Sequence, residues 1–290
     1  MTQTVGALLA AARPRLAAAA LDGAPVREAA LLLGYTLGLS EAQVLAREER
    51  GVPPETAARF AELLDRRLRG EPFAYLTGER EFFGRSFHVD PRVLIPRPET
   101  EHAIEAALRL AGRGTLPPAP RILDVGTGSG CLAVTLALEI PAARVVATDL
   151  SPGALAVARG NARRLGAREQ VALLALDLTA GLDLRRFDLV VSNPPYIDAA
   201  DAPSLSPEVC KFEPHLALFS PGAGDSTLAR LFAQCGDREA GIAAAATVIV
   251  EIGAGQLDAA RRHAGAAGLA VVEVVGDYQG IPRTLLLRRA

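Results

Sequence analysis

The sequence is poor in the residues that most often build metal sites, disulfide frameworks and histidine-based catalysis. Its 290 residues include three cysteines, four histidines, one methionine and no tryptophan. Cys131, Cys210 and Cys235 have neither paired spacing nor the spacing of metal ligands, which argues against a disulfide scaffold and indicates small buried side chains. The histidines, at positions 88, 102, 215 and 263, are scattered, so the sequence predicts no metal and no histidine base.

A strong charge of either sign is also missing, as is a long uninterrupted apolar run. The formal net charge is -2 and the pI is about 6.1, which argues against a protein that binds by covering phosphates with basic side chains. The apolar stretch over residues 1–20 is interrupted by Arg13, Pro14 and Arg15 before it reaches a membrane-spanning length. With 50% hydrophobic residues the chain can fill a sizeable core. We therefore expect a soluble cytoplasmic protein of two domains that does not bind a membrane.

The most informative stretch that is present is the tetrapeptide Asn193-Pro194-Pro195-Tyr196. It follows residues 187–192, an apolar and β-branched run that is typical of a buried parallel strand. Neither proline can donate a hydrogen bond to a sheet, so the strand must end here. Ligands of open α/β sheets bind at the carboxyl ends of the strands. The tetrapeptide therefore marks a predicted reaction centre; the alternative is a strand that ends in a proline turn with an ordinary asparagine cap.

The residue types of this tetrapeptide suit a particular chemistry, and the tetrapeptide resembles the Asn-Pro-Pro-Tyr signature of methyltransferases that act on a planar nitrogen. Such a nitrogen is a poor nucleophile and must be held in line with the methyl group. The side-chain oxygen of Asn193 can accept one N–H of the target. The carbonyl of Pro194 can accept the other, because Pro195 favours an extended conformation there. Tyr196 offers a flat face for packing.

A glycine-rich segment upstream predicts the cofactor site. Residues 121–125 form an apolar strand pattern, and Gly126, Gly128 and Gly130 follow it. Glycine allows positive φ and close approach of a ligand to the backbone. The dinucleotide fingerprint would need glycine at position 131, where this chain has Cys131. The spacing instead resembles the loop of S-adenosylmethionine enzymes. The next strand ends at Asp149, whose carboxylate can accept hydrogen bonds from both ribose hydroxyls.

Taken together, these motifs identify a family resemblance that covers nearly the whole chain. The sequence resembles PrmC/HemK-type protein-(glutamine-N5) methyltransferases, which modify the glutamine of the Gly-Gly-Gln motif in peptide chain release factors. Besides the two motifs above, the resemblance rests on residues 70–78, 81–84, 93–101 and 212–214. The most specific of these is the run Ile-Pro-Arg-Pro-Glu-Thr-Glu at residues 95–101.

The resemblance implies roles for individual residues, with S-adenosyl-L-methionine as the cofactor and release factors as the partners. It implies that the backbone of Gly126, Thr127, Gly128, Ser129 and Gly130 binds the cofactor together with Asp149, and that Asn193 lies beside both cofactor and substrate. Asn193, Pro194, Pro195 and Tyr196 would hold the glutamine amide, with Asn193 and Pro194 as the catalytic pair.

The sequence departs from the expected pattern after the third predicted strand. An aromatic residue often follows the acid there and packs near the adenine, but this chain has Leu178, which can cover the base without stacking on it. Asp177 can accept a hydrogen bond from the adenine amino group, and a helix N-cap role is the alternative.

The pattern along the chain predicts three parts: a helical domain over residues 1–80, a hairpin and extended linker over 81–98, and a methyltransferase domain over 99–290. The hairpin is expected to turn at Gly84 and Arg85. The helical domain is either a module that docks the release factor, as the family implies, or a stabilising appendage. In the linker and the following helix, predicted over 99–111, the roles of Arg97, Glu99 and Glu101 stay open between substrate contact and helix capping.

The third part alternates strands and helices and predicts a doubly wound α/β sheet of seven strands, Rossmann-like in class. Strands are expected at 121–126, 144–149, 171–177, 187–193, 246–253, 270–277 and 284–288, and the resemblance implies that the last one inserts antiparallel. Helices are expected near 130–140, 153–166, 225–239 and 255–268. The long segment 198–224 is expected to be an active-site loop, in which Glu213 either closes over the substrate or acts as a latch.

Two other functions fit parts of the pattern. A methyltransferase that acts on an exocyclic amino group of DNA or RNA would share the tetrapeptide, but a basic patch or base-recognition domain is not visible, and we expect no direct nucleic acid binding. A non-catalytic adenine-nucleotide binder on the same fold would leave Asn193-Pro194-Pro195-Tyr196 unexplained.

Overall fold

The computed structural model describes residues 3–19, 21 and 24–290 and divides into two compact units. One comprises Met1–Glu79 together with Ser204–Phe212, and the other comprises Arg80–Pro203 together with Glu213–Ala290. Chain segments that are far apart in sequence therefore build each unit, and a short part of the long loop 198–224 belongs to the first. We call the first the helical unit and the second the sheet unit.

The helical unit is built from short helices around one apolar core. Its helices are α1 (Val5–Ala18), α2 (Pro25–Leu37), α3 (Glu41–Leu45), α4 (Pro54–Leu68), α5 (Phe73–Thr77) and α9 (Pro207–Phe212). Local signals set their ends: Gly38, at φ +65°, ends α2, and Ser40 and Gln43 form a capping box that begins α3. The buried side chains of Leu9, Leu32 and Phe60 belong to the core that joins these helices.

A buried arginine holds α9 in the helical unit. The Arg67 side chain is 1% exposed and donates hydrogen bonds to Glu28 Oε2 at 2.5 Å and to Glu208 Oε1 at 2.7 Å. It also donates to the backbone carbonyl of Glu71 at 3.1 Å. An arginine buried to this degree needs such partners, because an unpaired buried charge is strongly destabilising. The contact with Glu208 explains why residues 204–212 pack with helices that precede them by more than a hundred residues.

A two-stranded hairpin opens the sheet unit, with β1 (Glu79–Phe82) paired to β2 (Arg85–His88). The expected turn at Gly84 and Arg85 is wrong by one residue. Phe83 and Gly84 form the turn, with φ of +50° and +71°, as a two-residue turn with positive φ at both positions requires. Phe83 is held in this conformation by the carboxylate of Glu101, which accepts a hydrogen bond from the Phe83 backbone N–H at 2.7 Å.

The centre of the sheet unit is a seven-stranded sheet in the order β10-β11-β9-β6-β3-β4-β5. The strands are β3 (Arg121–Val125), β4 (Arg144–Asp149), β5 (Val171–Ala175), β6 (Leu189–Ser192), β9 (Thr247–Glu251), β10 (Leu269–Gly276) and β11 (Pro282–Arg289). The pairs from β5 through β9 are parallel, and β11 lies antiparallel between β9 and β10. The predicted fold class and the inserted antiparallel strand are thereby confirmed, and strand ends differ from the predicted ones by up to two residues.

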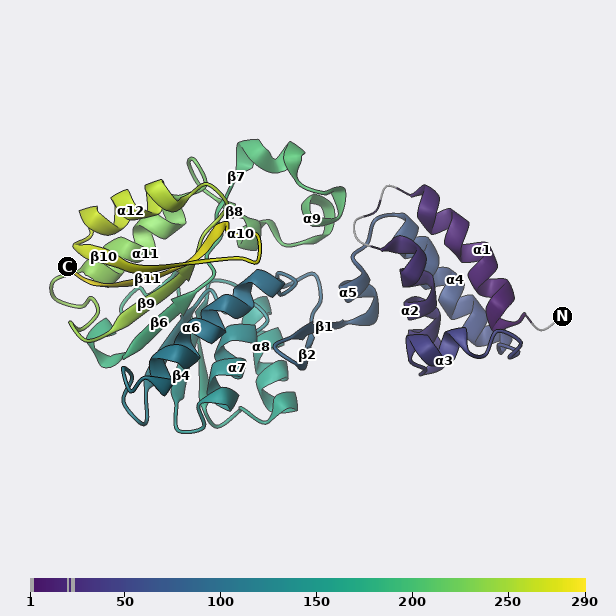
Figure 1. Cartoon of the computed structure of the whole chain (residues 1–290), viewed down its shortest axis with the longest axis horizontal. Coiled ribbons are helices and arrows are strands. Elements are labelled where there is room, and N and C mark those ends of the chain that lie inside the picture. Colours follow the sequence, from purple (N-terminus) through teal and green to yellow (C-terminus); the bar gives the residue numbers. More distant parts are fainter. Residues whose placement is uncertain (1–2, 20, 22–23) are drawn as a thin grey trace. The chain divides into compact units, whose positions relative to one another are not determined.

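Helices cover both faces of this sheet, as Figure 1 shows. One face packs against α6 (Glu101–Gly112), α7 (Cys131–Glu139) and α8 (Pro152–Leu165), and the other against α11 (Ser226–Gly236) and α12 (Leu257–Ala266). The central strands are buried on both sides, which is why their sequences read as continuous apolar runs. A one-turn 3-10 helix, Pro98–Thr100, precedes α6, so the predicted helix over 99–111 begins in a different geometry.

The remaining elements of the chain are short. They comprise η2 (Leu184–Arg186), η3 (Ala199–Ser204), α10 (His215–Leu218), and a two-stranded parallel pair of β7 (Ile197–Asp198) and β8 (Phe219–Ser220). Apart from η2, these elements together with α9 give the long loop 198–224 regular structure. The described residues include no helix that is long and apolar enough to cross a membrane.

Candidate active site

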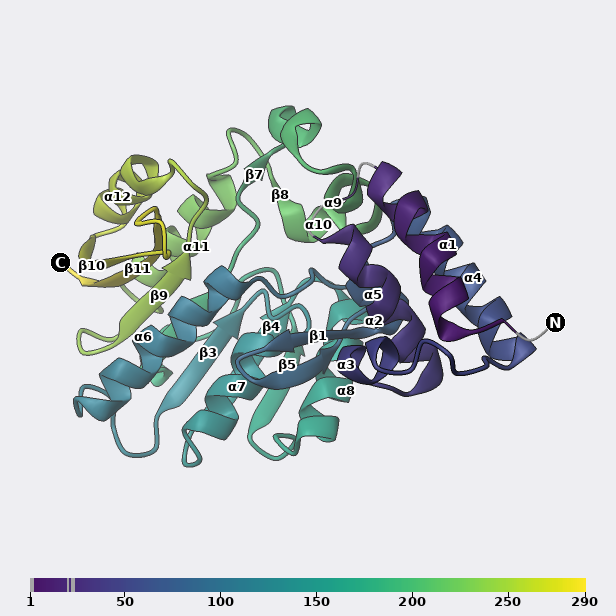
Figure 2. The same cartoon turned by 45° about the vertical axis from the view of Figure 1, so that its right-hand side comes forward.

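A cavity of about 480 Å³ lies at the carboxyl ends of the parallel strands. Its wall is formed by the segments that follow β3, β4, β5 and β6, by residues 92–94 of the linker, and by residues between 214 and 230. Figure 2 shows three of these strands, β3, β4 and β5, which are neighbours in the sheet. Seven of the residues predicted as site residues line it: Gly126, Gly128, Asp149, Asp177, Leu178, Asn193 and Pro195.

The glycines after β3 are required for two different reasons. Gly126 and Gly128 have φ of +76° and +54°, and a Cβ built on either one would meet nothing within 4 Å. Their backbone therefore presents open space to the cavity, which a ligand can approach closely. Gly130, at φ +82°, instead packs against α8, where its Cβ would lie 3.2 Å from the Cβ of Ala158. Its role in the structure is close packing at the start of α7.

Thr127 and Ser129 face the protein interior. The Thr127 side chain donates a hydrogen bond to Asp124 Oδ2 at 2.6 Å, and the Ser129 carbonyl accepts one from Asn161 at 2.8 Å. Asp124 also accepts from the backbone N–H of Ala133 at 3.1 Å. Burial raises the pKa of Asp124 to about 7, against 3.8 for an ordinary aspartate. These contacts hold the glycine loop against β3 and α7.

Asp149 links the end of β4 to the glycine loop. Its Oδ2 accepts a hydrogen bond from the Gly128 backbone N–H at 2.9 Å, and its Oδ1 accepts one from Ser151 N–H at 2.8 Å. Burial raises the pKa of this carboxyl, and the backbone hydrogen bonds partly oppose that rise. Asp149 lines the cavity, and each carboxylate oxygen has two lone pairs, so the group can also accept hydrogen bonds from hydroxyls of a ligand.

The segment after β5 combines an ion pair with a strained backbone. Asp177 pairs with Arg230 at 2.6 Å, and both line the cavity. Leu178 has φ of +54°, which is unusual for a residue with a Cβ, and its carbonyl accepts a hydrogen bond from Thr148 at 3.0 Å. Residues in such conformations cluster at functional sites because the surrounding structure has to enforce them.

Of the tetrapeptide after β6, Asn193 and Pro195 line the cavity, whereas Pro194 and Tyr196 are not among its lining residues. Asn193 is half-buried, and its Nδ2 donates a hydrogen bond to Thr100 Oγ1 at 3.0 Å. Pro194 is buried, and Pro195 lines the cavity. The Tyr196 hydroxyl donates to Glu251 Oε1 at 3.3 Å, and burial raises the pKa of Tyr196.

Two residues of this network were missed by the sequence reasoning. Thr100 and Glu251 are each 2% exposed, and the Thr100 hydroxyl donates to Glu251 Oε2 at 2.6 Å. A signal for Glu251 exists in the sequence. It follows the apolar run Val248-Ile249-Val250, just as Asp149 follows the apolar residues of its own strand, β4. An acid at the carboxyl end of a buried strand is the same signature in both places.

The residues whose roles stayed open are now placed. Glu213 is buried and accepts hydrogen bonds from the Ile95 backbone N–H at 3.1 Å and from Arg97 at 2.5 Å, so it ties the linker to the segment that follows α9. Glu101 holds the hairpin turn, as described above. Burial raises the pKa of Glu251, and the negative charge of Glu99 adds to that rise.

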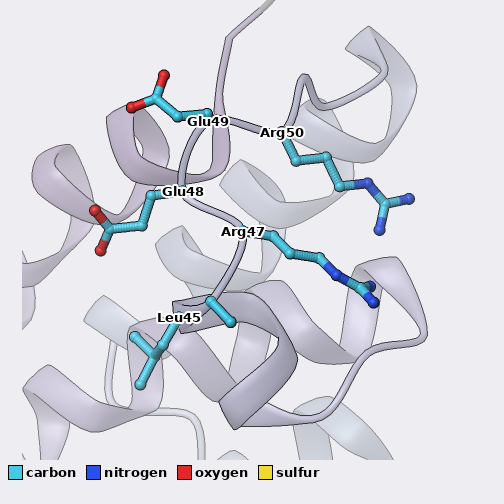
Figure 3. Close-up of a pocket in the computed structure, with 6 residues that line it drawn as sticks. Leu45, Arg47, Glu48, Glu49 and Arg50 are labelled. Atoms are coloured by element: carbon cyan, nitrogen blue, oxygen red, sulfur yellow. The ribbon is translucent and has the colours of Figure 1, made fainter.

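A separate hollow of about 630 Å³ in the helical unit is lined by Leu45, Ala46, Arg47, Glu48, Glu49 and Arg50. Figure 3 shows the two arginines and the two glutamates extending to opposite sides of the turn. All six residues are exposed, so water screens their charges and the hollow offers no desolvated group for chemistry. In the part of the chain that the structure describes, no cluster of three or more His, Cys, Asp or Glu could hold a metal ion.

Comparison with known proteins decides the family. The models for the "PrmC N-terminal domain" and the "Methyltransferase small domain" match residues 7–78 and 113–207. A release factor glutamine methyltransferase of Cereibacter sphaeroides is 44% identical over 280 residues, which cover 97% of this chain and 96% of the relative. One from Bordetella pertussis is 46% identical over 263 residues, with 90% and 94% covered. The chain belongs to the release factor glutamine methyltransferase family. The predicted resemblance is confirmed, and the protein is a methyltransferase.

Solved structures agree with this family's fold. The hMettl16 catalytic domain, in complex with an RNA hairpin, superposes with a TM-score of 0.57 at 17% identity, covering 83% of this chain and 84% of that one. The 16S rRNA methyltransferase RsmC of T. thermophilus, in complex with AdoMet and guanosine, gives 0.51 at 17% identity, covering 73% and 50%. At these identities the likeness concerns the fold alone.

Proposed function

We propose that this protein transfers a methyl group from S-adenosyl-L-methionine to the side-chain amide N5 of the glutamine in the Gly-Gly-Gln motif of peptide chain release factors. Family membership supports the reaction and the class of substrate. The observation that carries the proposal in the structure is the position of Asn193. Its Nδ2 is engaged by Thr100 while the residue lines the cavity, so its Oδ1 is left to accept a hydrogen bond there.

The residues of the cavity fit the cofactor. Its volume, about 480 Å³, is within the range of small-molecule sites. Gly126 and Gly128 leave space where any side chain would protrude, and Asp149 supplies acceptors for ribose hydroxyls. Asp177 and Leu178 lie together on the third loop, where they can contact the adenine by a hydrogen bond and by apolar cover. When bound, S-adenosylmethionine supplies a methyl group on a positively charged sulfur.

The residues of this chain would position the glutamine amide of the substrate. Asn193 Oδ1 and the Pro194 carbonyl are the proposed acceptors for the two N–H groups of the glutamine amide, and the faces of Pro195 and Tyr196 pack beside it. Two acceptors fix the amide plane and aim the nitrogen, which is the main contribution a site without a strong base can make. The amide loses its proton after it has been methylated, so no residue has to remove that proton beforehand.

The helical unit is the proposed docking module for the release factor, as the family resemblance implies, and the "PrmC N-terminal domain" model matches residues 7–78 within it. Its core is complete, and the exposed Val26, Tyr35 and Leu45 provide apolar contact surface on it. The proposal includes a cytoplasmic location, where release factors act, and recognition of protein without direct contact to nucleic acid.

The direct test is mass spectrometry of a release factor after incubation with this protein and S-adenosylmethionine. We expect one added methyl group on the glutamine of the Gly-Gly-Gln motif. A release factor in which that glutamine is replaced by alanine is the matched control and should gain none. Unmodified release factor together with methylated DNA or RNA in a parallel reaction would instead favour the nucleic acid alternative.

A further inference from the structure

We propose that Glu251 and Thr100 are positioning residues that fix which end of the Asn193 amide faces the substrate. The inference rests on the proposed function, because the substrate group it concerns is the glutamine amide. Asn193 has an oxygen that accepts hydrogen bonds and a nitrogen that donates them, and only the oxygen suits the N–H groups of that amide. A rotation of the side-chain amide by half a turn would bring two donors face to face.

The three residues form a continuous hydrogen-bonded chain, in which Thr100 and Glu251 are buried and Asn193 is half-buried. Strands β6 and β9 are parallel neighbours with Ser192 paired to Val250, so Asn193 and Glu251 follow paired positions at the carboxyl ends of both strands. Thr100 lies between them: it accepts from Asn193 Nδ2 at 3.0 Å and donates to Glu251 Oε2 at 2.6 Å.

The direction of these hydrogen bonds follows from the chemistry of the groups. A carboxylate can only accept, so the single proton of the Thr100 hydroxyl goes to Glu251. The Thr100 oxygen is then left with lone pairs alone, and only the nitrogen of Asn193 can satisfy it. Asn193 Oδ1 must therefore point away from Thr100. An oxygen facing Thr100 would meet another oxygen without a proton between them.

Two further observations support a dedicated role. Thr100 is the last residue of the 3-10 helix that precedes α6, and its side chain makes no capping hydrogen bond, so its hydroxyl is available for the bonds to Asn193 and Glu251. Glu251 also accepts from the Tyr196 hydroxyl, so one carboxylate holds both ends of the tetrapeptide. Burial and the charge of Glu99 raise the pKa of Glu251, whereas the hydrogen bonds from Thr100 and Tyr196 and the charge of Arg283 favour its ionised form.

The experiment compares Thr100→Val and Glu251→Gln with wild type in the release factor assay. Valine keeps the shape of threonine but removes the hydroxyl, and with it the Asn193–Thr100–Glu251 relay of hydrogen bonds. Glutamine at position 251 can donate to the Thr100 oxygen, so that the hydroxyl proton of Thr100 can turn toward Asn193. We expect kcat to fall about 10-fold to 100-fold, as when a positioning group is lost, with the dissociation constant for S-adenosylmethionine changed less than about threefold. Affinity for a Gly-Gly-Gln peptide, measured by calorimetry with S-adenosylhomocysteine bound, should fall as well.

Two variants separate this role from general packing. Thr100→Ser keeps the hydroxyl and should restore most of the activity. Thr135→Val is the matched control, because Thr135 is fully buried on α7 and its hydroxyl has no hydrogen-bond partner among the described residues. It should leave kcat near the wild-type value. Thermal unfolding of every variant checks that the fold is retained.

The outcomes distinguish this inference from the proposed function. If wild type methylates the release factor but Thr100→Val keeps its kcat, or Thr100→Ser is no better than Thr100→Val, the inference is overturned while the function stands. If wild type methylates no release factor, the proposed function fails. The hydrogen bond from Asn193 to Thr100 can then still be tested by NMR, through the side-chain amide resonances of Asn193. One Nδ2 proton should exchange slowly in wild type and rapidly in Thr100→Val; equally rapid exchange in both proteins would overturn the relay.

Discussion

Replacing Asp124 by asparagine should change how the stability of the sheet unit depends on pH. Asp124 is fully buried in β3, and one of its carboxyl oxygens accepts from Thr127 and Ala133. The other, Oδ1, has no partner among the described residues. Asparagine can keep both accepted hydrogen bonds and place its NH₂ group where Oδ1 lies. It therefore imitates the protonated carboxyl and cannot ionise.

The sign and size of the effect follow from the pKa. Burial raises the pKa of Asp124 from the ordinary 3.8 to about 7, so between these values the folded chain holds a proton that the unfolded chain has lost. Stability must then fall as pH rises through that window and stay constant, for this group, above about 7. Each pKa unit corresponds to about 1.4 kcal/mol, which gives roughly 4 kcal/mol over the whole window and roughly 3 kcal/mol between about pH 5 and 7.

The assay is urea unfolding without cofactor at pH 5 and pH 8, followed by circular dichroism. The transition of the sheet unit is the one that S-adenosylhomocysteine shifts to higher urea, because a ligand stabilises only the unit that binds it. Between pH 5 and pH 8, the free energy of unfolding of the wild-type sheet unit should fall by roughly 3 kcal/mol more than that of Asp124→Asn. Asp258→Asn, which removes an exposed carboxylate on α12, controls for net charge. If the free energies of unfolding of wild type and Asp124→Asn differ by the same amount at both pH values, the prediction is refuted.

Three further predictions concern the cavity directly. Asn193→Ala should lower methyl transfer about 100-fold or more while S-adenosylmethionine affinity stays within several-fold; an equal loss in both would make Asn193 a cofactor contact only. Asp149→Ala should weaken cofactor binding in calorimetry by about 10-fold or more, because hydroxyl acceptors and the anchor of Gly128 are lost together, and an unchanged dissociation constant would remove Asp149 from the ribose site. Leu178→Phe should tighten cofactor binding by about threefold to tenfold if this side chain covers the adenine, since an aromatic ring adds stacking; no change would place the base elsewhere.

The sequence predicted those parts of the fold that depend on local patterns. Apolar runs located all seven strands, because central strands of this sheet are buried on both faces. The glycine loop and the tetrapeptide could be placed because proline and glycine impose their backbone conformations wherever they occur. The hairpin turn was misplaced by one residue for the opposite reason. Nothing in the character of Phe83 favours a positive φ, which is maintained by a hydrogen bond to Glu101.

What the sequence could not show are pairings between distant side chains. Thr100 and Glu251 are separated by 151 positions, and their contact follows only from the sheet order and the packing of the segment before α6. The same holds for Arg67 and Glu208, whose ion pair assigns residues 204–212 to the helical unit. A buried charged or polar group needs partners, but the rule does not say which residues supply them.

The positions of the buried carboxyl groups bear on which ligand the cavity prefers. Asp124, Asp149 and Glu251 lie toward the carboxyl ends of β3, β4 and β9, and burial raises the pKa of each. Asp149 is the one of the three that lines the cavity, and a positive charge beside it would favour its ionised form. Its carboxylate therefore favours a cationic ligand over a neutral one of the same shape. Methyl transfer converts a positively charged sulfur into a neutral one, so this electrostatic preference supports binding of the donor and weakens on formation of the product.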